Sequence, residues 1–383
     1  MKIKFVGIVF LVICCDSALA QDLVGTYQLA IQNDPLLKKA YFTQYSVGES
    51  KAQSIANMLP TISVTGRTSR DRINSKKANF QSAGTQNYWN HGFTVNFSQP
   101  VFHWEHWVQL DQSSNRIAKA EADYQAELQN LIVKTTEAYF NILAAEDNLQ
   151  FTVSELKAIE RQLEQAQQRF DVGLIAITDV YEAQAGFDQA RANQIDAENN
   201  LDDSKEALIE IIGEHKIELN SLSKTINLSP PSPNNSSEWS KVAETSNLTI
   251  ISALNQAEVI SSRSRQAHFD YKVAKEELLS VKRQVKRQVR NSFRDINSSI
   301  NRVQALEAAV ASAESSLEAT LAGAEVGTRT MVDVLSEQKN LYRAKRDYSR
   351  TRYDYLISGI KLKQAASSLT EQDLELINQY IEQ

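Results

Sequence analysis

The sequence predicts a mainly α-helical protein with a small β part: very long antiparallel coiled-coil helices, one transmembrane-type β-hairpin and a tandem structural repeat. Three observations lead to this fold. The two halves of the chain repeat each other, long stretches contain no proline and little glycine, and one short region alternates between apolar and polar residues. The first pattern sets the organisation, and the other two distinguish helices from strands.

The repeat runs at two spacings. Early in each half, residues 30–35 match residues 243–248 at a spacing of 213, whereas residues 171–184 match residues 325–338 at a spacing of 154. The second spacing is shorter by 59, so the second half is expected to lack a counterpart of about 57–115. The expected organisation is a signal peptide at 1–20, repeat 1 at 21–228 with its hairpin at 60–100, a linker at 229–238, and repeat 2 at 239–383 with its hairpin missing near 269/270.

Residues 1–20 have the pattern of a secretory signal peptide. Two lysines precede an apolar core at Phe5–Cys14, and Ala18–Ala20 is a small-residue cleavage site. The alternative, an uncleaved anchor, is disfavoured because the apolar core is too short to span a bilayer. Both cysteines lie in this segment, so we expect the exported chain to contain no disulfide and no cysteine-bound metal.

Long helices are expected in both halves, because residues 101–229 and 234–383 contain no proline. From Leu128 to Phe170 the seam positions recur every three or four residues, which is typical of supercoiled helices. We therefore expect one helix over about Lys119–Phe170; a coiled-coil rod and a channel wall explain its apolar face equally well. No later segment has 18 consecutive apolar residues, so β-strands would have to make any membrane crossing.

A β-hairpin is expected over 60–100. Residues 60–66 and 93–98 alternate apolar and polar, and a polar loop from Arg67 to His91 joins them. The alternation favours membrane strands over the alternative, a soluble hairpin buried on one face, and aromatic residues near the strand ends fit a membrane girdle. The residues expected to face lipid are Ile62, Val64, Phe93, Val95 and Phe97.

Each half also contains a tight helix reversal, at 171–180 and at 325–334. Gly173 and Gly327 suit the left-handed residue that ends a helix. The expected capping-box pairs are Asp179 with Glu182 and Thr330 with Asp333. Capping alone explains where these acids lie. It does not explain why the second turn carries Arg329 where the first has an isoleucine.

The two turns, the stretch Gly327–Leu335, the C-terminal residues Ser368–Asn378 and the duplicated layout resemble the TolC family of outer-membrane efflux and type I secretion channels. The likeness covers about residues 23–378. In that family three protomers share one β-barrel in the outer membrane and one helical barrel through the periplasm. The resemblance implies a homotrimer in the outer membrane, with helices in the periplasm, engaged by a periplasmic adaptor (membrane fusion) protein and an inner-membrane transporter.

The resemblance also implies roles for residues in the turns. The pore constriction would be lined by Asp333, and the closed gate would be held by Arg329, Asp179 and Thr178. Two family side chains are absent, since Ser336 replaces a second aspartate and Ala324 replaces a tyrosine. The closed gate is therefore expected to depend on fewer bonds. The missing hairpin leaves three protomers with six strands, fewer than the roughly eight of small membrane barrels.

The expected function is a passive trimeric exit duct for drugs or secreted proteins. The alternative is a soluble periplasmic coiled-coil relative that does not insert into the membrane. No catalytic motif, phosphate loop or dinucleotide fingerprint occurs, so we expect no enzyme activity and no cofactor. The pair His103 and His106 has metal-like spacing without further ligands nearby, so no metal site is expected. Net charge is −6, and the basic cluster at 282–290 is expected to be a solvated helix face, not a nucleic-acid site.

The junction left by the missing hairpin poses a separate question. Local chemistry favours a continuous helix there, because residues 265–274 contain no glycine or proline. Packing favours a reversal, because the following helix keeps the large-and-small seam of its counterpart. A forced turn costs only about 1–3 kcal/mol. We therefore expect a tight turn at about Ala267–Tyr271.

Overall fold

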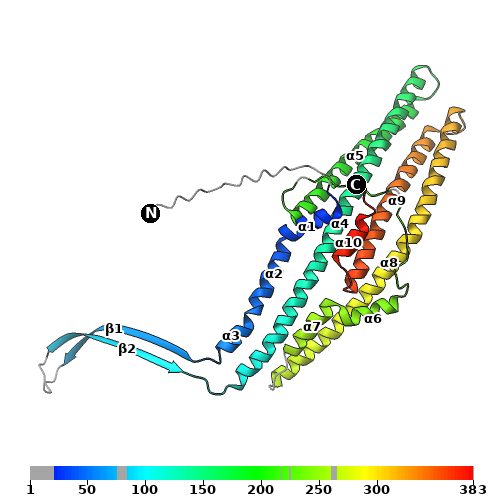
Figure 1. Cartoon of the computed structure of the whole chain (residues 1–383). Coiled ribbons are helices and arrows are strands. Elements are labelled where there is room, and N and C mark those ends of the chain that lie inside the picture. Colours follow the sequence, from blue (N-terminus) through cyan, green and yellow to red (C-terminus); the bar gives the residue numbers. More distant parts are fainter. Residues whose placement is uncertain (1–20, 76–83, 216, 224–225, 260–264, 383) are drawn as a thin grey trace, which may run out of the picture. The chain divides into compact units, whose positions relative to one another are not determined.

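The computed structural model of the chain describes residues 21–75, 84–215, 217–223, 226–259 and 265–382 (Figure 1). The expected signal peptide lies outside these residues. The elements are α1 Leu23–Asn33, α2 Pro35–Gly48, α3 Ser50–Ala56, β1 Thr61–Ser75, β2 Gly84–Ser98, α4 Trp104–Asp171, α5 Ile177–Ile212, α6 Ser236–Ser246, α7 Leu248–Val259, α8 Arg265–Glu325, α9 Met331–Ala365 and α10 Glu371–Asn378. Long helices and one antiparallel strand pair confirm the predicted fold class.

The tandem repeat is visible in the helix boundaries. Helices α1 and α6 begin and end at a spacing of 213, and α5 and α9 begin at a spacing of 154. The residues that divide one helix from the next repeat as well. Asp34 and Asn247 each donate a backbone N–H to the carbonyl four residues earlier, and each side chain accepts an N–H from the helix that follows. The two copies therefore share the hydrogen bonds that set their helix boundaries.

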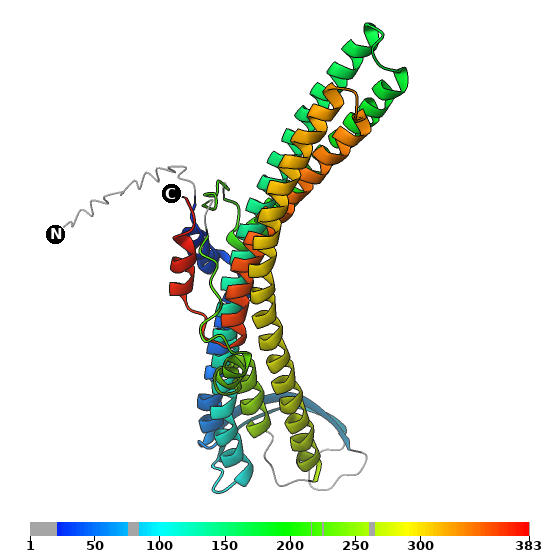
Figure 2. The same ribbon diagram turned by 90° about the vertical axis from the view of Figure 1, so that its right-hand side faces the viewer.

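Four helices dominate the structure. Helix α4 turns back into α5, and α8 turns back into α9, which gives two antiparallel pairs (Figure 2). With 68 residues, α4 is about 100 Å long. It begins well before the expected Lys119, because no residue after Pro100 interrupts the helix. The predicted seams are buried over much of their length, as at Leu131, Thr135, Ala138, Ile142, Thr152, Ile159, Ala166, Val289, Ser292, Ile296, Val303 and Thr320.

The main hydrophobic core lies where the short helices α1 and α10 pack against the long ones. Its fully buried side chains include Leu23, Tyr139, Phe140, Ile142, Leu208, Ile211, Ile212, Ile360 and Leu374. The hydroxyl of Tyr139 donates to the carbonyl oxygens of Gln21 at 3.2 Å and Asn220 at 2.9 Å. This buried tyrosine therefore fixes two irregular segments to the middle of α4.

Polar contacts join α4 to α9, and so connect the two helix pairs. Arg346 forms an ion pair with Glu155 at 2.8 Å, and the glutamate side chain is almost completely buried. The carboxylate of Asp147 accepts hydrogen bonds from Ser349 and from the Tyr353 hydroxyl, the latter at 2.8 Å. Removing one member of such a buried pair leaves an uncompensated charge, so these contacts fix how the two pairs pack together.

Strands β1 and β2 pair in one antiparallel ladder along their full length. The expectation of a polar loop from Arg67 to His91 was wrong, because most of that stretch belongs to the strands. Its polar side chains still alternate and meet across the ladder. Thr68 and His91 form a side-chain hydrogen bond at 2.8 Å, and the Arg70 guanidinium lies 5.7 Å from the centre of the Trp89 ring. The polar residues here show that the apolar face of the hairpin becomes polar, while the two strands continue.

The expected turn at Ala267–Tyr271 was wrong in position. Helix α7 ends at Val259 and α8 begins at Arg265, so 267–271 lies within the first turns of α8. The segment between the two helices lies outside the described residues. Without glycine or proline at 267–271, helix propensity prevails there. Among the described residues, no strand of the sheet comes from the second half of the chain.

The last residues of the expected linker, 229–238, are helical. Helix α6 begins at Ser236, inside the expected range 229–238, because the side chain of Asn235 caps it by accepting the N–H of Ser237. The start of the linker is held to α9, where the Tyr355 hydroxyl bonds to both the N–H and the carbonyl of Ser229. The segment is thus attached to the helices at its start and capped at its end.

The chain forms two compact units, which do not coincide with the two repeats. One unit contains residues up to Tyr41, 122–251 and 279–383, and the other contains 42–121 and 252–278. Each unit therefore draws residues from both halves. The first holds the core and the ends of the long helix pairs, and the second holds the β-hairpin.

Candidate functional site

Both helix pairs end in a tight turn with the same backbone conformation. Gly173 has φ of +75° and Gly327 has φ of +77°, in the left-handed region that glycine adopts without strain. The amide of the residue after each glycine donates to the carbonyl five residues earlier, at 2.8 Å in the first turn and 2.9 Å in the second. These are Schellman motifs, and the left-handed glycine predicted at the end of each helix is confirmed.

The second turn starts its next helix with a complete capping box. The Thr330 hydroxyl accepts the backbone N–H of Asp333 at 3.2 Å, and the Asp333 carboxylate accepts the backbone N–H of Thr330 at 2.9 Å. The prediction for this pair is confirmed. The bond from the Thr330 backbone, and then the bond from its hydroxyl, hold the pKa of the Asp333 carboxyl below its ordinary value. This carboxylate is therefore charged at neutral pH.

The first turn lacks such a box, and the prediction that Asp179 forms one with Glu182 was wrong. Helix α5 begins at Ile177, so its N-cap is Ala176, which has no side-chain cap. Asp179 is then the third residue of the helix, and its amide bonds to the Ala176 carbonyl at 3.1 Å. An acid in the first turn still interacts favourably with the positive end of the helix.

Arg329 lies across its own turn. Its side chain covers Gly323, where a Cβ atom would lie 2.8 Å from the arginine Cγ. The first turn has the opposite arrangement, because the counterpart of Gly323 at a spacing of 154 is Arg169 and the counterpart of Arg329 is Ile175. Gly323 is a residue that sequence reasoning missed. Comparing the two copies position by position would have revealed this exchange of residue types.

The residues expected to form the gate are not joined within one chain. Among the hydrogen bonds and ion pairs of the described residues, none links Arg329 to Thr178 or Asp179. Thr178 and Arg329 are exposed, and Asp179 is partly exposed. All three side chains therefore remain accessible to a partner at the ends of the helix pairs.

A groove of about 500 Å³ lies between the ends of the two pairs. It is lined by Gln162, Gln165, Gln168, Arg169, Val172, Leu321, Ala324, Glu325, Met331 and Val334. Met331 also packs against the small apolar cluster of the first turn, which contains Ala166, Val180 and Ala183. The ends of the pairs are thus packed by apolar contacts, with amide and charged side chains along the groove.

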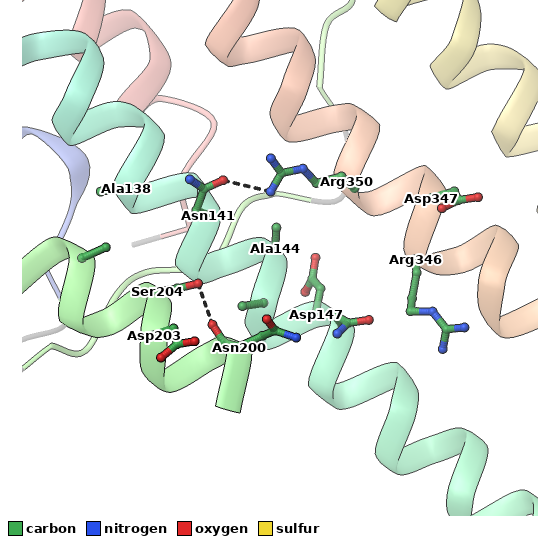
Figure 3. A pocket seen from close by; sticks show the side chains of 13 residues that line it. Ala138, Asn141, Ala144, Asp147, Asn200, Asp203, Ser204, Arg346, Asp347 and Arg350 are labelled. Atoms are coloured by element: carbon green, nitrogen blue, oxygen red, sulfur yellow. Dashed lines mark hydrogen bonds between the residues drawn. The ribbon is translucent and has the colours of Figure 1, made fainter. Parts of the chain in front are cut away.

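Further along the same pairs, a second groove of about 580 Å³ is lined by α4, α5 and α9 (Figure 3). Arg350 of α9 donates to the Asn141 side chain at 2.9 Å across it, and Asp147, Asp203 and Arg346 lie along its walls. Its lining residues from α5 and α9 are mostly polar or charged. No signal in the sequence had pointed to it, because its residues come from three distant segments.

The five residues expected to face lipid lie on one face of the hairpin. Ile62 is opposite Phe97, and Val64 is opposite Val95, while Phe93 is opposite a glycine. All five side chains are more than half exposed. Their alternate neighbours, which include Ser63, Thr65, Thr94 and Asn96, form the polar face. An exposed apolar face of this kind marks an interaction surface for protein or lipid.

Beyond these rungs the same face becomes polar and aromatic. Trp89 is exposed, stacks on the His91 ring with 6.0 Å between centroids, and lies beneath Arg70. Exposed tryptophans also occur at 104 and 107, at the start of α4. Amphipathic rings of this kind favour the boundary between lipid and water.

The described part of the chain contains neither a cluster of metal ligands nor a membrane-spanning helix. The rings of His103 and His106 lie close together, with centroids 5.1 Å apart, but no group of three or more metal-ligating residues occurs in the described part of the chain. In the same described part, no helix is both long enough and apolar enough to cross a membrane.

Comparison with known proteins identifies the family. Residues 26–214 and 226–368 match the family model described as outer membrane efflux protein. The chain belongs to this family. Outer membrane protein TolC of Vibrio cholerae serotype O1 is 33% identical, and the alignment covers 94% of this chain and 93% of the relative. The alkaline protease secretion protein AprF of Pseudomonas aeruginosa is 24% identical, with 96% of this chain and 89% of the relative covered.

The fold agrees with that of solved outer membrane efflux channels. The Campylobacter jejuni CmeC outer membrane channel superposes with a TM-score of 0.74 at 13% identity, covering 94% of this chain and 90% of that one. The TolC alignment has 419 positions, more than the 383 residues of this chain, so part of the relative has no counterpart here. As an outer membrane efflux protein, the chain is an outer-membrane channel protein and not an enzyme.

Proposed function

We propose that three copies of this chain form a passive exit duct, with the hairpins in the outer membrane and the long helices in the periplasm. The observation that carries the proposal is the pair of matched turns at the ends of two antiparallel helix pairs. A threefold arrangement would place six such turns around one axis and close the duct there. The apolar face of the hairpin, with five exposed side chains, provides the surface that lipid would cover.

The aperture of the duct is proposed to be lined by Asp333. Its carboxylate is held charged by Thr330, and threefold symmetry would bring three such charges together. A ring of carboxylates favours cations over anions at a constriction. The duct would supply no energy of its own, since a ring of fixed charges only selects and slows what diffuses through it.

The closed state is proposed to be held between copies. Arg329 of one copy would donate charge-assisted hydrogen bonds to Asp179 and to the Thr178 hydroxyl of its neighbour. The exposure of these side chains, and the absence of their bond within the described part of one chain, support a contact between copies. Because Ser336 and Ala324 cannot supply further charged or phenolic bonds, this link would carry most of the closed state.

The proposed partners are a periplasmic adaptor protein and an energised inner-membrane transporter. A passive duct supplies no energy, so a transporter would have to drive the cargo into it. An adaptor would hold that transporter at the end of the duct that carries the turns. The name of AprF, an alkaline protease secretion protein, supports secreted proteins as cargo, and the family description supports a role in efflux. Drugs are the second class of cargo that we propose. No cofactor or metal is needed for this role.

One observation favours the alternative, a periplasmic relative that does not insert. The described residues contain two strands per chain, so three copies would bring six. Small membrane barrels have at least about eight strands. The family match favours insertion, because it covers the hairpin.

Bilayer recording separates the two functions. The full chain is expressed with its leader, the outer-membrane fraction is isolated, and the purified protein is added to a planar lipid bilayer. Stable trimers in the outer membrane that conduct cations would support the duct. A soluble periplasmic chain without conductance would support the alternative and refute the duct.

A further inference from the structure

The middle of α8 carries an unusual charge pattern. Residues 282–294 contain six lysines and arginines and no acid. Four of them, Arg283, Arg287, Arg290 and Arg294, recur at helical spacing and form one exposed row opposite the buried seam. Lys286 lies beside the row and pairs with Glu244 of α6 at 3.4 Å. The solvated helix face expected from the sequence is thus a row of like charges about 16 Å long.

The row has little compensation within its own chain. Arg294 donates to the neutral side chain of Asn291, and no ion pair of the described residues involves any of the four arginines. Like charges three or four residues apart on a helix destabilise it by a few tenths of a kcal/mol per pair. An isolated helix therefore gains nothing from this row, and an acidic surface against it would remove the repulsion.

The second half of α5 has the opposite pattern. Residues 196–210 contain six acids and one lysine. Asp202, Glu206 and Glu210 are four residues apart and exposed, on a face away from the buried stripe that packs against α1. Glu210 lies 4.0 Å from the Lys134 ammonium, yet 78% of its side chain remains exposed. The acidic row is thus exposed and has little charge compensation within the described part of its own chain, like the basic row.

The two rows lie at the same level along the helix pairs. Glu206 and Arg294 are each 33 residues from the glycine of their own turn, and Glu210 and Arg290 are each 37 residues away. Both distances correspond to about 50–55 Å of helix. Since the two turns share one backbone conformation, copies that stand side by side with their turns level would bring these positions opposite each other.

The rows also lie on opposite edges of one chain. Helix α9 contacts α5 on one side, and it contacts α8 on the other through Lys345 with Glu314. Figure 1 shows α9 between α5 and α8, and Figure 2 shows α8 at the front of the same group. One chain therefore presents its basic edge and its acidic edge in different directions, which is the arrangement of a head-to-tail ring.

We propose that the arginine row of α8 docks against the acidic row of α5 in a second copy of this chain, with Arg294 facing Glu206 and Arg290 facing Glu210. The proposal rests on the threefold assembly proposed above, and it adds the residues that set the register between copies. Interfacial charge rows mainly fix register and exclude wrong pairings. A one-turn slip of either helix would displace each arginine by about 5.4 Å from its acid.

Charge reversal tests the pairing. The full chain is purified in detergent, and the trimer fraction is measured against concentration and salt. Arg290→Glu with Arg294→Glu should weaken association at least about tenfold, and so should Glu206→Arg with Glu210→Arg. Combining all four substitutions should restore association, because the rows again have opposite signs. Arg302→Glu is the matched control for Arg294→Glu, since Arg302 is an exposed arginine on another face of α8.

Cross-linking gives a second measurement that does not depend on energetics. A Glu206→Cys and Arg294→Cys variant should form covalent trimers with a short bis-maleimide, whereas Glu206→Cys with Arg302→Cys should not. If both charge-reversal variants form trimers as well as the wild type does, the pairing is overturned and the proposed duct is left intact. A wild-type chain that stays monomeric would overturn both proposals. Altered ion selectivity with unchanged assembly would place the arginine row in the duct, and would also overturn the pairing.

Discussion

The turn after α4 and the turn after α8 have the same backbone but different side chains. Both use a glycine at φ near +75° and the same bond across the last helical turn. The second turn adds a capping box at Thr330 and an arginine packed on Gly323, and the first has neither. The backbone is thus the part that the duplication preserved. The added side chains distinguish the second turn, which carries the proposed aperture residue Asp333 and the arginine donor of the proposed gate.

The largest expected effect concerns the link between the two turns. Arg329→Ser removes the donor and Asp179→Ala removes the acceptor, so each should raise conductance or antibiotic leakage. Hydrogen bonds to charged groups contribute about 1.5–3 kcal/mol, which corresponds to roughly a 10- to 100-fold shift toward the open state. The double variant should add little to either single change, because both remove one interaction. Additive effects in single-channel recordings would show that the residues do not pair.

Next come the glycines, which test whether the two backbones are equivalent. Gly173→Ala and Gly327→Ala each force a Cβ into the left-handed region and should each cost about 1–2 kcal/mol. Gly323→Ala should also destabilise, because its Cβ would lie 2.8 Å from the Arg329 Cγ. Thermal unfolding followed by circular dichroism measures all three. Adding Arg329→Ser to Gly323→Ala should recover most of the loss; no recovery would mean that the arginine does not cause the strain.

A smaller effect is expected from exchanging the caps. Thr330→Ala should destabilise α9 by about 1 kcal/mol, because an N-cap hydroxyl is lost. Ala176→Thr should stabilise α5 by a similar amount, since Ala176 already has the extended backbone of an N-cap. Hydrogen exchange at the first turns of α5 and α9 reports each change locally. If the protection from exchange is the same in both variants as in the wild type, the two turns do not differ in the stability of their caps.

The smallest effect on stability is expected from Asp333→Asn, because the amide oxygen can still accept from Thr330. Its effect on selectivity should be clear, with cation preference and cation block both reduced. The pKa of Asp333 is lower in the folded chain than in the unfolded chain. The contribution of this carboxylate to folding stability is therefore present above the unfolded-state pKa, and it is lost as pH falls through the lower folded-state pKa. Wild-type selectivity should therefore persist below the ordinary aspartate pKa. Unchanged selectivity in Asp333→Asn would exclude this residue from the pore.

Much of the fold was predictable because the repeat is a pattern of helix boundaries. The caps Asp34 and Asn247, and the turn glycines Gly173 and Gly327, are determined by local hydrogen bonds that a sequence displays directly. The strand lengths were underestimated, because the apolar pattern fades at Gly66 while backbone pairing continues. Pairing depends on the partner strand, which local polarity does not reveal.

The candidate site was less predictable, for a related reason. Asp179 has the spacing of a cap, but the helix begins two residues earlier at Ile177, and spacing alone does not fix the start of a helix. A turn was expected at Ala267–Tyr271, but these residues lie within α8. The prediction gave packing more weight than helix propensity, and the sequence alone does not show which of the two prevails. Gly323 was missed because its role depends on a side chain six residues away, which only folding brings onto it.

The length of α4 has a mechanical consequence. Between the buried Phe140 and the turn at Gly173 there is no glycine or proline, and sharp helix kinks occur mainly at such residues. The part of α4 between Phe140 and Gly173 therefore moves as one rigid segment about 50 Å long, which pivots at the aromatic core. A rotation of one degree at the core displaces the turn by about 1 Å. Core substitutions far from the proposed aperture should thus displace the turn and alter the opening, although no side chain at the turn is changed.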